Sequence, residues 1–415
     1  MFIKFLFCVN SECNIMNPQV VIIGHGYLSR LSLVRSVAEI GCDVTVIVMT
    51  SQFEGKQSSQ KPIDCYSKYV SHYYYCVRKD KDALVSLLLD KCADPLQKVI
   101  LIPDGDDVVA AIDNNKDRLK EHFLFPHIAK EPSSMEYWME KTHQKQLAKE
   151  IGLNVTNATI VEIKDGQYTI PSDLQYPVFP KPLATMNGGK GGMMRCDNPK
   201  ELSEALDYIV KTRSRNTKVM VEDYKQIETE YALLGFSDGK EVVIPGVLQF
   251  LAVSKAHPGI ALQGKVVPVV GFEDLVEKFK ELVLRIGFVG VFDVDFFKSE
   301  GIFYFCELNL RYGGSGYAIT KMGVNLPAMM VNHFYGKSIE AMNKSIIKEA
   351  VYVNDRMCMD DWNNGSLSLK AYKRYIKTSD IRFICDDQDS LPKIEYEKMF
   401  KKRLLVNLIK KILRK

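Results

Sequence analysis

The stretch that most constrains the fold is VGVFDVDFFKSEGIFYFCELNLRYGG, which begins at residue 289. Two runs rich in aliphatic and aromatic residues flank the turn signal Ser299 to Gly301, so the stretch predicts a β-hairpin. Side chains at positions i and i+2 of a strand share a face, so Glu307 and Asn309 point the same way and the turn brings Asp295 opposite them. Oxygen ligands of this kind suit Mg²⁺.

A solvent-exposed strand face would also carry acids at alternate positions. Here the neighbouring residues are heavily apolar and aromatic, so we expect half-buried strands, and a buried carboxylate needs a partner. We therefore predict that Asp295, Glu307 and Asn309 hold Mg²⁺ or Mn²⁺. Asp293 lies on the face of Asp295 and is a further candidate.

A second motif, PVFPKPLATMNGGKGGMMRC, places Lys181 at the end of a short strand, just before a glycine-rich loop. Glycines let backbone N–H groups close over phosphates, and a strand-borne lysine can reach phosphate oxygens. The loop residues that we expect at the nucleotide are Gly188, Gly189, Lys190 and Gly191. A solvated flexible loop would have the same composition, and the Walker A pattern G-x-x-x-x-G-K-[ST] is absent.

The segment from residue 20 to residue 48 predicts a βαβ unit, with buried strands at 20–23 and 44–48 around a glycine turn and a helix. A further strand near residue 100 and a helical pattern after it complete an α/β domain on a mainly parallel sheet over residues 16–125. The turn GHGYLS lacks the third glycine of a dinucleotide-binding loop, which speaks against a dehydrogenase. Gly24 to Gly26 and Asp104 to Asp106 lie at strand ends and either form turns or contact substrate.

From about residue 133 the pattern changes to α+β. One helix is expected from residue 133 to residue 152, where Gly152 ends it. The strands expected after it are 178–180, 218–221, 231–236, 242–244, 291–297 and 303–308. Helices are expected near 199–212 and 272–286.

Length and composition agree with a multi-domain enzyme. The chain has 415 residues and a net charge of +4, and it has no basic stripe interleaved with aromatics, so we expect no nucleic-acid partner. The ten cysteines are scattered singly, which favours reduced thiols in the cytoplasm. No apolar run approaches the roughly 20 residues of a membrane-spanning helix. Met16 is an alternative start to Met1, and the sequence leaves open whether the chain forms a homodimer.

In combination these motifs resemble the ATP-grasp superfamily of carboxylate-amine ligases, including the ATP-binding region of carbamoyl-phosphate synthetase large chains, over residues 18–340. The resemblance implies an N-terminal Rossmann-like pre-ATP-grasp domain followed by a two-lobed ATP-grasp fold. The domains expected are 16–125 for the pre-ATP-grasp domain, 126–220 for the small lobe with its glycine-rich lid, 221–345 for the large lobe with the magnesium site, and 346–415 for a C-terminal extension.

The resemblance also implies roles for cationic residues. Lys141, in MEKTHQKQLAKEIGL, stands where the family has a lysine that contacts the nucleotide phosphates. Lys181 matches the strand-borne lysine that reaches the α- and β-phosphates. Arg311 matches the arginine that steadies the transferred phosphoryl group. The bland alternatives are an exposed helix lysine, a loop lysine and a structural partner of Glu307, respectively.

A third segment, VMVEDYKQIETEYALL, looks like the hinge that receives adenine in this family. The resemblance places Glu222 and backbone groups of Asp223 and Tyr224 at the base edge, and Glu230 at the ribose. Solvated acids in a hinge would look the same in the sequence.

The implied cofactors are ATP and Mg²⁺, and the implied substrates are a small-molecule carboxylate and an amine. ATP would convert the carboxylate into an acyl phosphate, and the amine would then displace phosphate to form an amide. Within the superfamily the chain is similar to D-aspartate ligases of bacterial envelope synthesis. An ATP-grasp kinase or carboxylase, or an inactive nucleotide-binding module, remains an alternative.

The C-terminal sequence EKMFKKRLLVNLIKKILRK predicts a basic amphipathic helix. The apolar residues that we expect along one side are Phe400, Leu404, Leu405, Leu408, Ile409, Ile412 and Leu413. Such a helix lies either in a membrane interface or on the core of the protein itself. The membrane interpretation would place a cytoplasmic protein at the inner face of the cell membrane.

Overall fold

The computed structural model describes residues 17–50, 61–77, 80–183, 193–212 and 214–413. Within these residues the N-terminal part forms a parallel sheet with the strand order β3-β2-β1-β4-β5, which we call the first sheet. Its strands are β1 (Gln19–Gly24), β2 (Asp43–Thr50), β3 (Val70–Val77), β4 (Val99–Asp104) and β5 (Phe123–Leu124). Its helices are α1 (Tyr27–Ala38), α2 (Lys81–Lys91), α3 (Asp106–Asp113) and α4 (Lys116–Leu119), with the 3₁₀ turn η1 (Ile63–Tyr66). The predicted α/β domain is confirmed.

The central strands of this sheet are apolar without alternation because helices cover both faces. Every residue of β4 is buried, and so are Val20 to Gly24 of β1. The carboxyl ends of β1 and β4 therefore present their loops at one edge of the sheet, where Gly24 pairs with Asp104.

The middle of the chain builds a second, larger sheet with the order β15-β14-β10-β12-β13-β16-β17; within the described residues β11 pairs with β10 and β6 with β14. We call it the large sheet. Its strands are β6 (His127–Ile128), β10 (Thr229–Asp238), β11 (Val242–Val243), β12 (Val247–Val253), β13 (Ala261–Val267), β14 (Phe288–Ser299), β15 (Ile302–Asn309), β16 (Ala350–Val353) and β17 (Ile381–Arg382). Helices α8 (Glu273–Ile286), α9 (Gly316–Lys321) and α10 (Leu326–Phe334) belong to this part.

Helix α8 shows why these residues fold together. Val276, Phe279, Val283 and Ile286 recur at helical spacing and are buried. They pack with aromatic residues of β14 and β15 in one core. Gly287 ends the helix in the left-handed conformation at φ 75°, a position that favours glycine, and the chain turns directly into β14.

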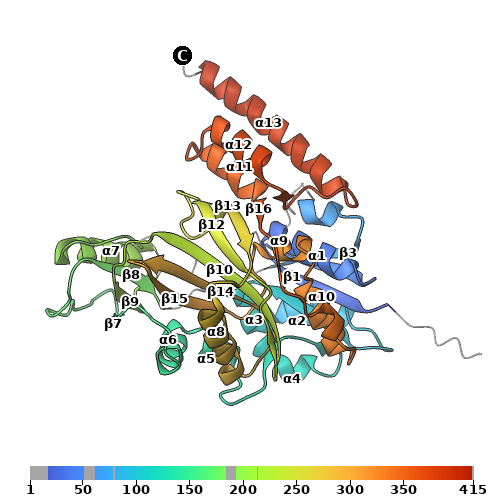
Figure 1. Cartoon of the computed structure of the whole chain (residues 1–415), viewed down its shortest axis with the longest axis horizontal. Coiled ribbons are helices and arrows are strands. Elements are labelled where there is room, and N and C mark those ends of the chain that lie inside the picture. Colours follow the sequence, from blue (N-terminus) through green and yellow to red (C-terminus); the bar gives the residue numbers. More distant parts are fainter. Residues whose placement is uncertain (1–16, 51–60, 78–79, 184–192, 213, 414–415) are drawn as a thin grey trace, which may run out of the picture.

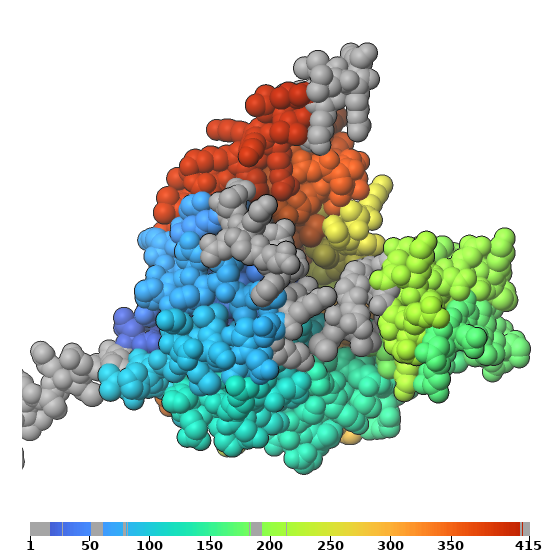
Figure 2. Space-filling model, turned by 180° about the vertical axis from the view of Figure 1, so that it is seen from behind, coloured from blue at the N-terminus to red at the C-terminus, as the bar shows by residue number. Residues whose placement is uncertain are grey.

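A third, small sheet has the order β7-β9-β8 among the described residues. Its elements are β7 (Ala158–Ile163), β8 (Val178–Pro182), β9 (Thr217–Asp223) and the covering helix α7 (Pro199–Thr212). It has its own core, in which Val161 and Val219 face Leu206. This sheet and α7 project as a separate lobe at one side of the molecule (Figures 1 and 2). The exact domain boundaries drawn from the sequence stay predictions.

One helix predicted before the small sheet is two helices in the structure. The expected helix from 133 to 152 splits into α5 (Met135–Met139) and α6 (Lys141–Glu150) because Glu140 is extended, with φ −77° and ψ 121°. The side chain of Gln144 helps to fix the second helix, since it donates to the carbonyl oxygens of Trp138 and Leu308. The break places Lys141 at the first turn of α6.

The C-terminal part continues from β16 into α11 (Asp355–Asn364), α12 (Leu369–Thr378) and, after β17, α13 (Leu391–Leu413), which runs along the outer side of the molecule (Figure 1). The expected helix α13 is present, but among its described residues only part of the expected apolar side is buried. Phe400 packs on Trp362 and Tyr372, whereas Leu405 and Ile409 are exposed. In the described part of the chain, no helix is long and apolar enough to span a membrane.

Candidate functional site

The hairpin β14–β15 has the geometry that the sequence predicts. Asp295 lies directly opposite Glu307, and Asp293 lies opposite Asn309. The amide of Asn309 donates to Asp295 Oδ2 at 3.2 Å, so the ligand candidates share one face of the hairpin. Their role in metal binding stays a prediction.

A β-bulge, which the sequence analysis missed, brings one more side chain to this face. Asp295 pairs with Glu307 while Phe296 pairs with Phe305, so Cys306 is the extra residue. A bulge of this kind re-aims the side chain of the unpaired residue. Burial raises the pKa of the Cys306 thiol to about 12, and the charges of Lys181 and Asp295 act on it, so the thiol lies among the candidate ligands.

Lys141 reaches the hairpin from the first turn of α6 and forms an ion pair with Glu307. Its side chain is only 12% exposed. Burial and then the charge of Lys181 lower the pKa of Lys141 to about 8, although the carboxylates of Asp106 and Asp295 oppose the shift. Lys141 is therefore not an exposed helix lysine.

Glu222 is buried between two lysines at the end of the small sheet. Lys181 on β8 lies 2.7 Å from Glu222 Oε2, and Lys145 on α6 contacts the other carboxylate oxygen. Burial opposes the charged form of Glu222, but the two lysines outweigh it and lower the pKa of this carboxyl. Burial likewise opposes the charge on Lys181, but Glu222 outweighs it and raises the pKa of the lysine.

Lys145 is a further candidate for the site that the sequence analysis missed. Its amine also donates to Thr156 Oγ1 at 2.7 Å, and it is 9% exposed. One signal in the sequence was available, because Lys145 follows Lys141 by four residues and so lies on the same face of the helix.

The hinge between the small and large sheets follows Glu222 directly. The backbone N–H of Asp223 donates to the carbonyl of Asn157 and that of Tyr224 donates to the carbonyl of Pro177, each at 3.0 Å. Both of these backbone N–H groups therefore already have partners within the described residues. Glu230 on β10 pairs with Phe297, two residues from Asp295, so it lies on the face of the metal candidates.

Arg311 follows β15 and joins the hairpin to the first domain. Its Nε donates to Asp106 Oδ1 at 2.7 Å, and its Nη2 donates to Asn309 Oδ1 at 3.3 Å. Burial lowers the pKa of Arg311, but the charges of Asp106 and Asp293 outweigh burial and raise it overall. The sequence alternative, a partner of Glu307, is replaced by a contact with α3.

Asp293 carries a further sign of a ligand site. It is 9% exposed, and its Oδ1 is buried without a hydrogen-bond partner in the described residues. Burial and the charge of Asp295 raise the pKa of this carboxyl, and a buried oxygen without a partner is unusual, so a water or an ion at this position would satisfy it. Gly313 lies against the other oxygen, because a Cβ at this position would come within 2.4 Å of Asp293 Oδ2.

The donor set fits a cation that is completed by phosphate oxygens. Nowhere in the described part of the chain do three His, Cys, Asp or Glu side chains form a group that could hold a metal ion by themselves. The candidate set instead has the carboxylates of Asp295 and Glu307 and the amide of Asn309. Mg²⁺ in phosphate-binding sites usually takes one or two carboxylates and leaves the other positions to waters and phosphates.

The glycine-rich lid predicted from the sequence stays a prediction. Gly188, Gly189, Lys190 and Gly191 lie outside the described residues.

Asp104, at the end of β4, is expected to make the free energy of unfolding depend on pH. Burial raises its pKa from 3.8 to about 7, although the hydrogen bond from Ser29 and the charges of Arg30 and Arg311 oppose the shift. The unfolded chain releases this proton at about pH 4. Because the folded protein holds it to a higher pH, the free energy of unfolding falls as the pH rises through this window.

Asp104→Asn cannot ionise, so we expect the variant to be more stable than the parent protein at pH 8 but not at pH 4. Calorimetric Tm values at the two pH values check this prediction. The same Tm difference at both would contradict it.

Comparisons with known proteins show what this chain is similar to. The large chain of carbamoyl phosphate synthase from Agathobacter rectalis is 24% identical over 180 residues, which cover 42% of this chain and 16% of that protein. The same protein from Methanothrix thermoacetophila is 22% identical over 229 residues, covering 54% of this chain and 21% of that protein. The chain thus spans only a small part of the length of these relatives. No family model matches it.

Solved structures match over most of the chain. The N5-carboxyaminoimidazole synthetase of Staphylococcus aureus, complexed with ADP, has a TM-score of 0.58 at 18% identity and covers 80% of this chain and 81% of its own. A biotin carboxylase from Campylobacter jejuni has a TM-score of 0.60 at 17% identity, over 80% and 74%. An L-amino acid ligase from Bacillus licheniformis has a TM-score of 0.58 at 16% identity, over 81% and 79%. At these identities the likeness is one of fold.

Proposed function

Because the chain has the ATP-grasp fold that these relatives and neighbours share, we propose that it is an ATP-dependent carboxylate-amine ligase. One observation carries the proposal: buried lysines, hard oxygen ligands and an arginine meet on a single hairpin face. Lys141 contacts Glu307, and Arg311 contacts Asn309. This group of cationic and oxygen-bearing side chains suits the binding of a nucleoside triphosphate beside a second anion.

Nucleotide would bind between the small and large sheets. Lys181 and Lys145, which share Glu222 in the structure, would turn to the phosphates, since a phosphate oxygen is a stronger partner than a carboxylate that two amines already neutralise. The carbonyl groups after Glu222 would face the amino group of adenine. Glu230, on the face of Asp295, would receive the ribose hydroxyls.

The metal would be held by Asp295, Glu307 and Asn309, and when bound it would neutralise charge on the β- and γ-phosphates. Lys141 and Arg311 would position the γ-phosphate and the substrate carboxylate for in-line attack. A carboxylate oxygen then forms a bond to the γ-phosphorus while the bond to ADP breaks. The amine attacks the resulting acyl carbon, phosphate leaves with that oxygen, and the nitrogen releases a proton to solvent.

Lys181→Ala tests the nucleotide part of this proposal. Loss of one charge-assisted contact of about 1.5–3 kcal/mol should weaken MgATP binding by about 10- to 100-fold. Isothermal titration calorimetry measures the change. Lys164→Ala is the matched control, because Lys164 is 74% exposed. Equal ATP affinity in the Lys181→Ala variant and the parent would remove this lysine from the phosphate site.

An ADP-release screen tests the reaction. The protein is assayed with MgATP and a panel of carboxylates, each with and without a panel of amino acids and simple amines. ADP release that requires both a carboxylate and an amine supports a ligase. Release that requires only an acceptor and yields a stable phosphorylated product supports a kinase, and release that depends on bicarbonate supports a carboxylase.

We also propose that α13 contacts anionic membranes, which would concentrate the enzyme beside an envelope precursor. The helix is attached by Phe400 and by Tyr396, whose hydroxyl meets that of Tyr372 at 2.8 Å. Its outward side exposes Leu405 at 59% and Ile409 at 46%, with Lys401 and Lys402 near them. Exposed apolar residues beside lysines suit the boundary of an anionic bilayer, where each lysine contributes about 1 kcal/mol.

The variant Leu405→Gln with Ile409→Gln tests membrane contact without removing the residues that attach the helix. The parent chain should sediment with vesicles that contain phosphatidylglycerol and stay in solution with phosphatidylcholine alone. The double variant should stay in solution with both. Equal recovery of parent and variant in the anionic pellet would contradict this role of α13.

A further inference from the structure

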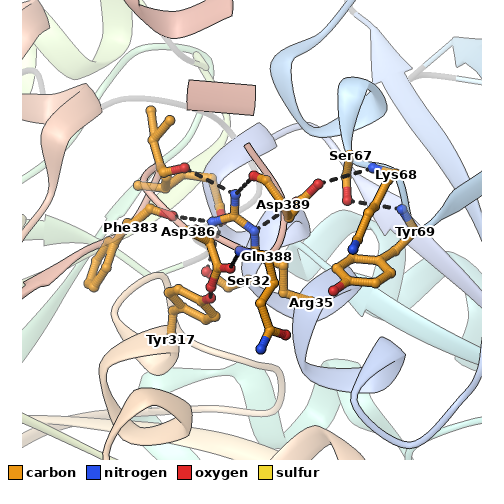
Figure 3. Close-up of polar contacts among 12 residues, drawn as sticks. Ser32, Arg35, Ser67, Lys68, Tyr69, Tyr317, Phe383, Asp386, Gln388 and Asp389 are labelled. Atoms are coloured by element: carbon orange, nitrogen blue, oxygen red, sulfur yellow. Dashed lines mark hydrogen bonds and ion pairs between the residues drawn. The ribbon is translucent and has the colours of Figure 1, made fainter. Parts of the chain in front are cut away.

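A buried polar network joins the C-terminal extension to the first domain (Figure 3), and Arg35 of α1 lies at its centre. Arg35 Nε donates to Asp389 Oδ2 at 2.9 Å, and Nη1 donates to the carbonyl oxygen of Phe383 at 2.9 Å. Nη2 donates to the carbonyl oxygens of Ile384 and Asp389 at 3.0 and 3.1 Å. Arg35 is 3% exposed and Asp389 is fully buried, so this ion pair between α1 and the C-terminal extension is shielded from solvent.

We call residues 383–389 the clamp segment. Its second contact is with α9, where the hydroxyl of Tyr317 donates to Asp386 Oδ2 at 2.5 Å and Lys321 lies 3.3 Å from the same oxygen. Burial opposes the charge on Asp386, but the hydrogen bond from Tyr317 and the charge of Lys321 outweigh it and lower the pKa of this carboxyl. The guanidinium of Arg35 also lies 5.6 Å from the centre of the Tyr317 ring.

Tyr317 leads directly to the candidate site. The N–H of Gly316, the residue before it, donates to the carbonyl of Gly313 at 3.0 Å and closes a turn. This turn begins two residues after Arg311. Gly313 lies against the carboxylate of Asp293, where no side chain would fit. Tyr317 thus directly follows a turn whose first residue packs against Asp293 and lies two residues after Arg311.

The structure assigns the clamp segment a positioning role: Asp386 holds Tyr317 and thereby fixes the Gly313–Gly316 turn beside Arg311. The segment lies about 70 residues beyond this turn in the sequence and comes from the C-terminal extension. The extension is thus part of the unit that orders the site. The contacts stand on the structure alone, whereas their effect on turnover rests on the proposed function.

Hydrogen exchange of the full-length protein tests the contact itself. In Asp386→Ala, the backbone amides of residues 313–320 should exchange about tenfold faster, because the turn loses its tether and opens locally. Residues 217–223, on the nucleotide side, should keep their exchange rates. Asp386→Asn keeps a hydrogen-bond acceptor and should restore most of the protection. Asp387→Ala, a change at the adjacent acid, is the control and should leave the exchange of residues 313–320 unchanged.

Tyr317→Phe is the second variant, since it removes only the hydroxyl and keeps the ring under Arg35. Asp386→Ala and Tyr317→Phe should each lower kcat of carboxylate-dependent ADP release about tenfold and leave MgATP affinity unchanged. Because Asp386→Ala already removes the hydrogen bond that Tyr317→Phe removes, the double variant should lose no more than Asp386→Ala alone. Unchanged exchange at residues 313–320 in both variants would overturn the proposal. Absence of ADP release in the parent protein would count against the proposed function alone.

Discussion

Asp295→Asn and Glu307→Gln are each expected to reduce Mg²⁺-dependent ADP release by about 10²- to 10³-fold, because the charge that faces the phosphates is lost at nearly constant side-chain size. Asp295 and Glu307 lie opposite each other on one face, and the Asn309 amide donates a hydrogen bond to Asp295. Neither substitution should unfold the protein. Initial rates of ADP release over a range of Mg²⁺ concentrations, together with the Tm, give the measurement.

Glu300→Gln is the matched control, because it removes a carboxylate from the exposed turn of the same hairpin. Its rate should equal that of the parent protein. A Glu307→Gln variant that retains the parent rate at limiting Mg²⁺ would contradict the metal assignment.

Arg30→Met is expected to lower the free energy of unfolding by about 3–5 kcal/mol, because it leaves a buried carboxylate without its partner. Arg30 Nε donates to Asp64 Oδ2 at 2.7 Å, and Nη1 donates to the carbonyl of Gly24 at 2.6 Å. The arginine and Asp64 side chains are 1% and 0% exposed. Urea titration followed by circular dichroism measures the loss.

Arg118→Met removes an arginine of the same domain from an exposed pair, in which Arg118 is 50% and Asp82 is 89% exposed. This variant should change the free energy of unfolding by less than about 1 kcal/mol. Equal losses in the two variants would mean that burial of the Arg30–Asp64 pair contributes nothing.

The hairpin was predictable because the chemistry lies within about 20 residues, where strand periodicity and a turn signal fix which side chains share a face. The same local rules gave the βαβ unit and α8. They do not reach Arg311 and Asp106, which are 205 residues apart. No local pattern distinguishes Asp106 from the acids beside it.

Two further differences have physical causes that a periodicity pattern does not contain. A bulge shifts the alternation of β15 by one residue, so Cys306 joins the face of Glu307. For α13 the sequence predicts one continuous apolar side, but among the described residues only the part around Phe400 packs in the core. Which part of a broad apolar face packs depends on the partner surface, here Trp362 and Tyr372.

The most direct test of the proposed function follows one oxygen atom. The acid that supports ADP release is supplied with ¹⁸O in both carboxylate oxygens, and the phosphate product is analysed by mass spectrometry. Attack of the carboxylate on the γ-phosphorus, followed by displacement by the amine, predicts one ¹⁸O in each phosphate and the other in the amide. Phosphate without label, released at the same rate as ADP, would mean that water attacks the nucleotide and would contradict carboxylate activation.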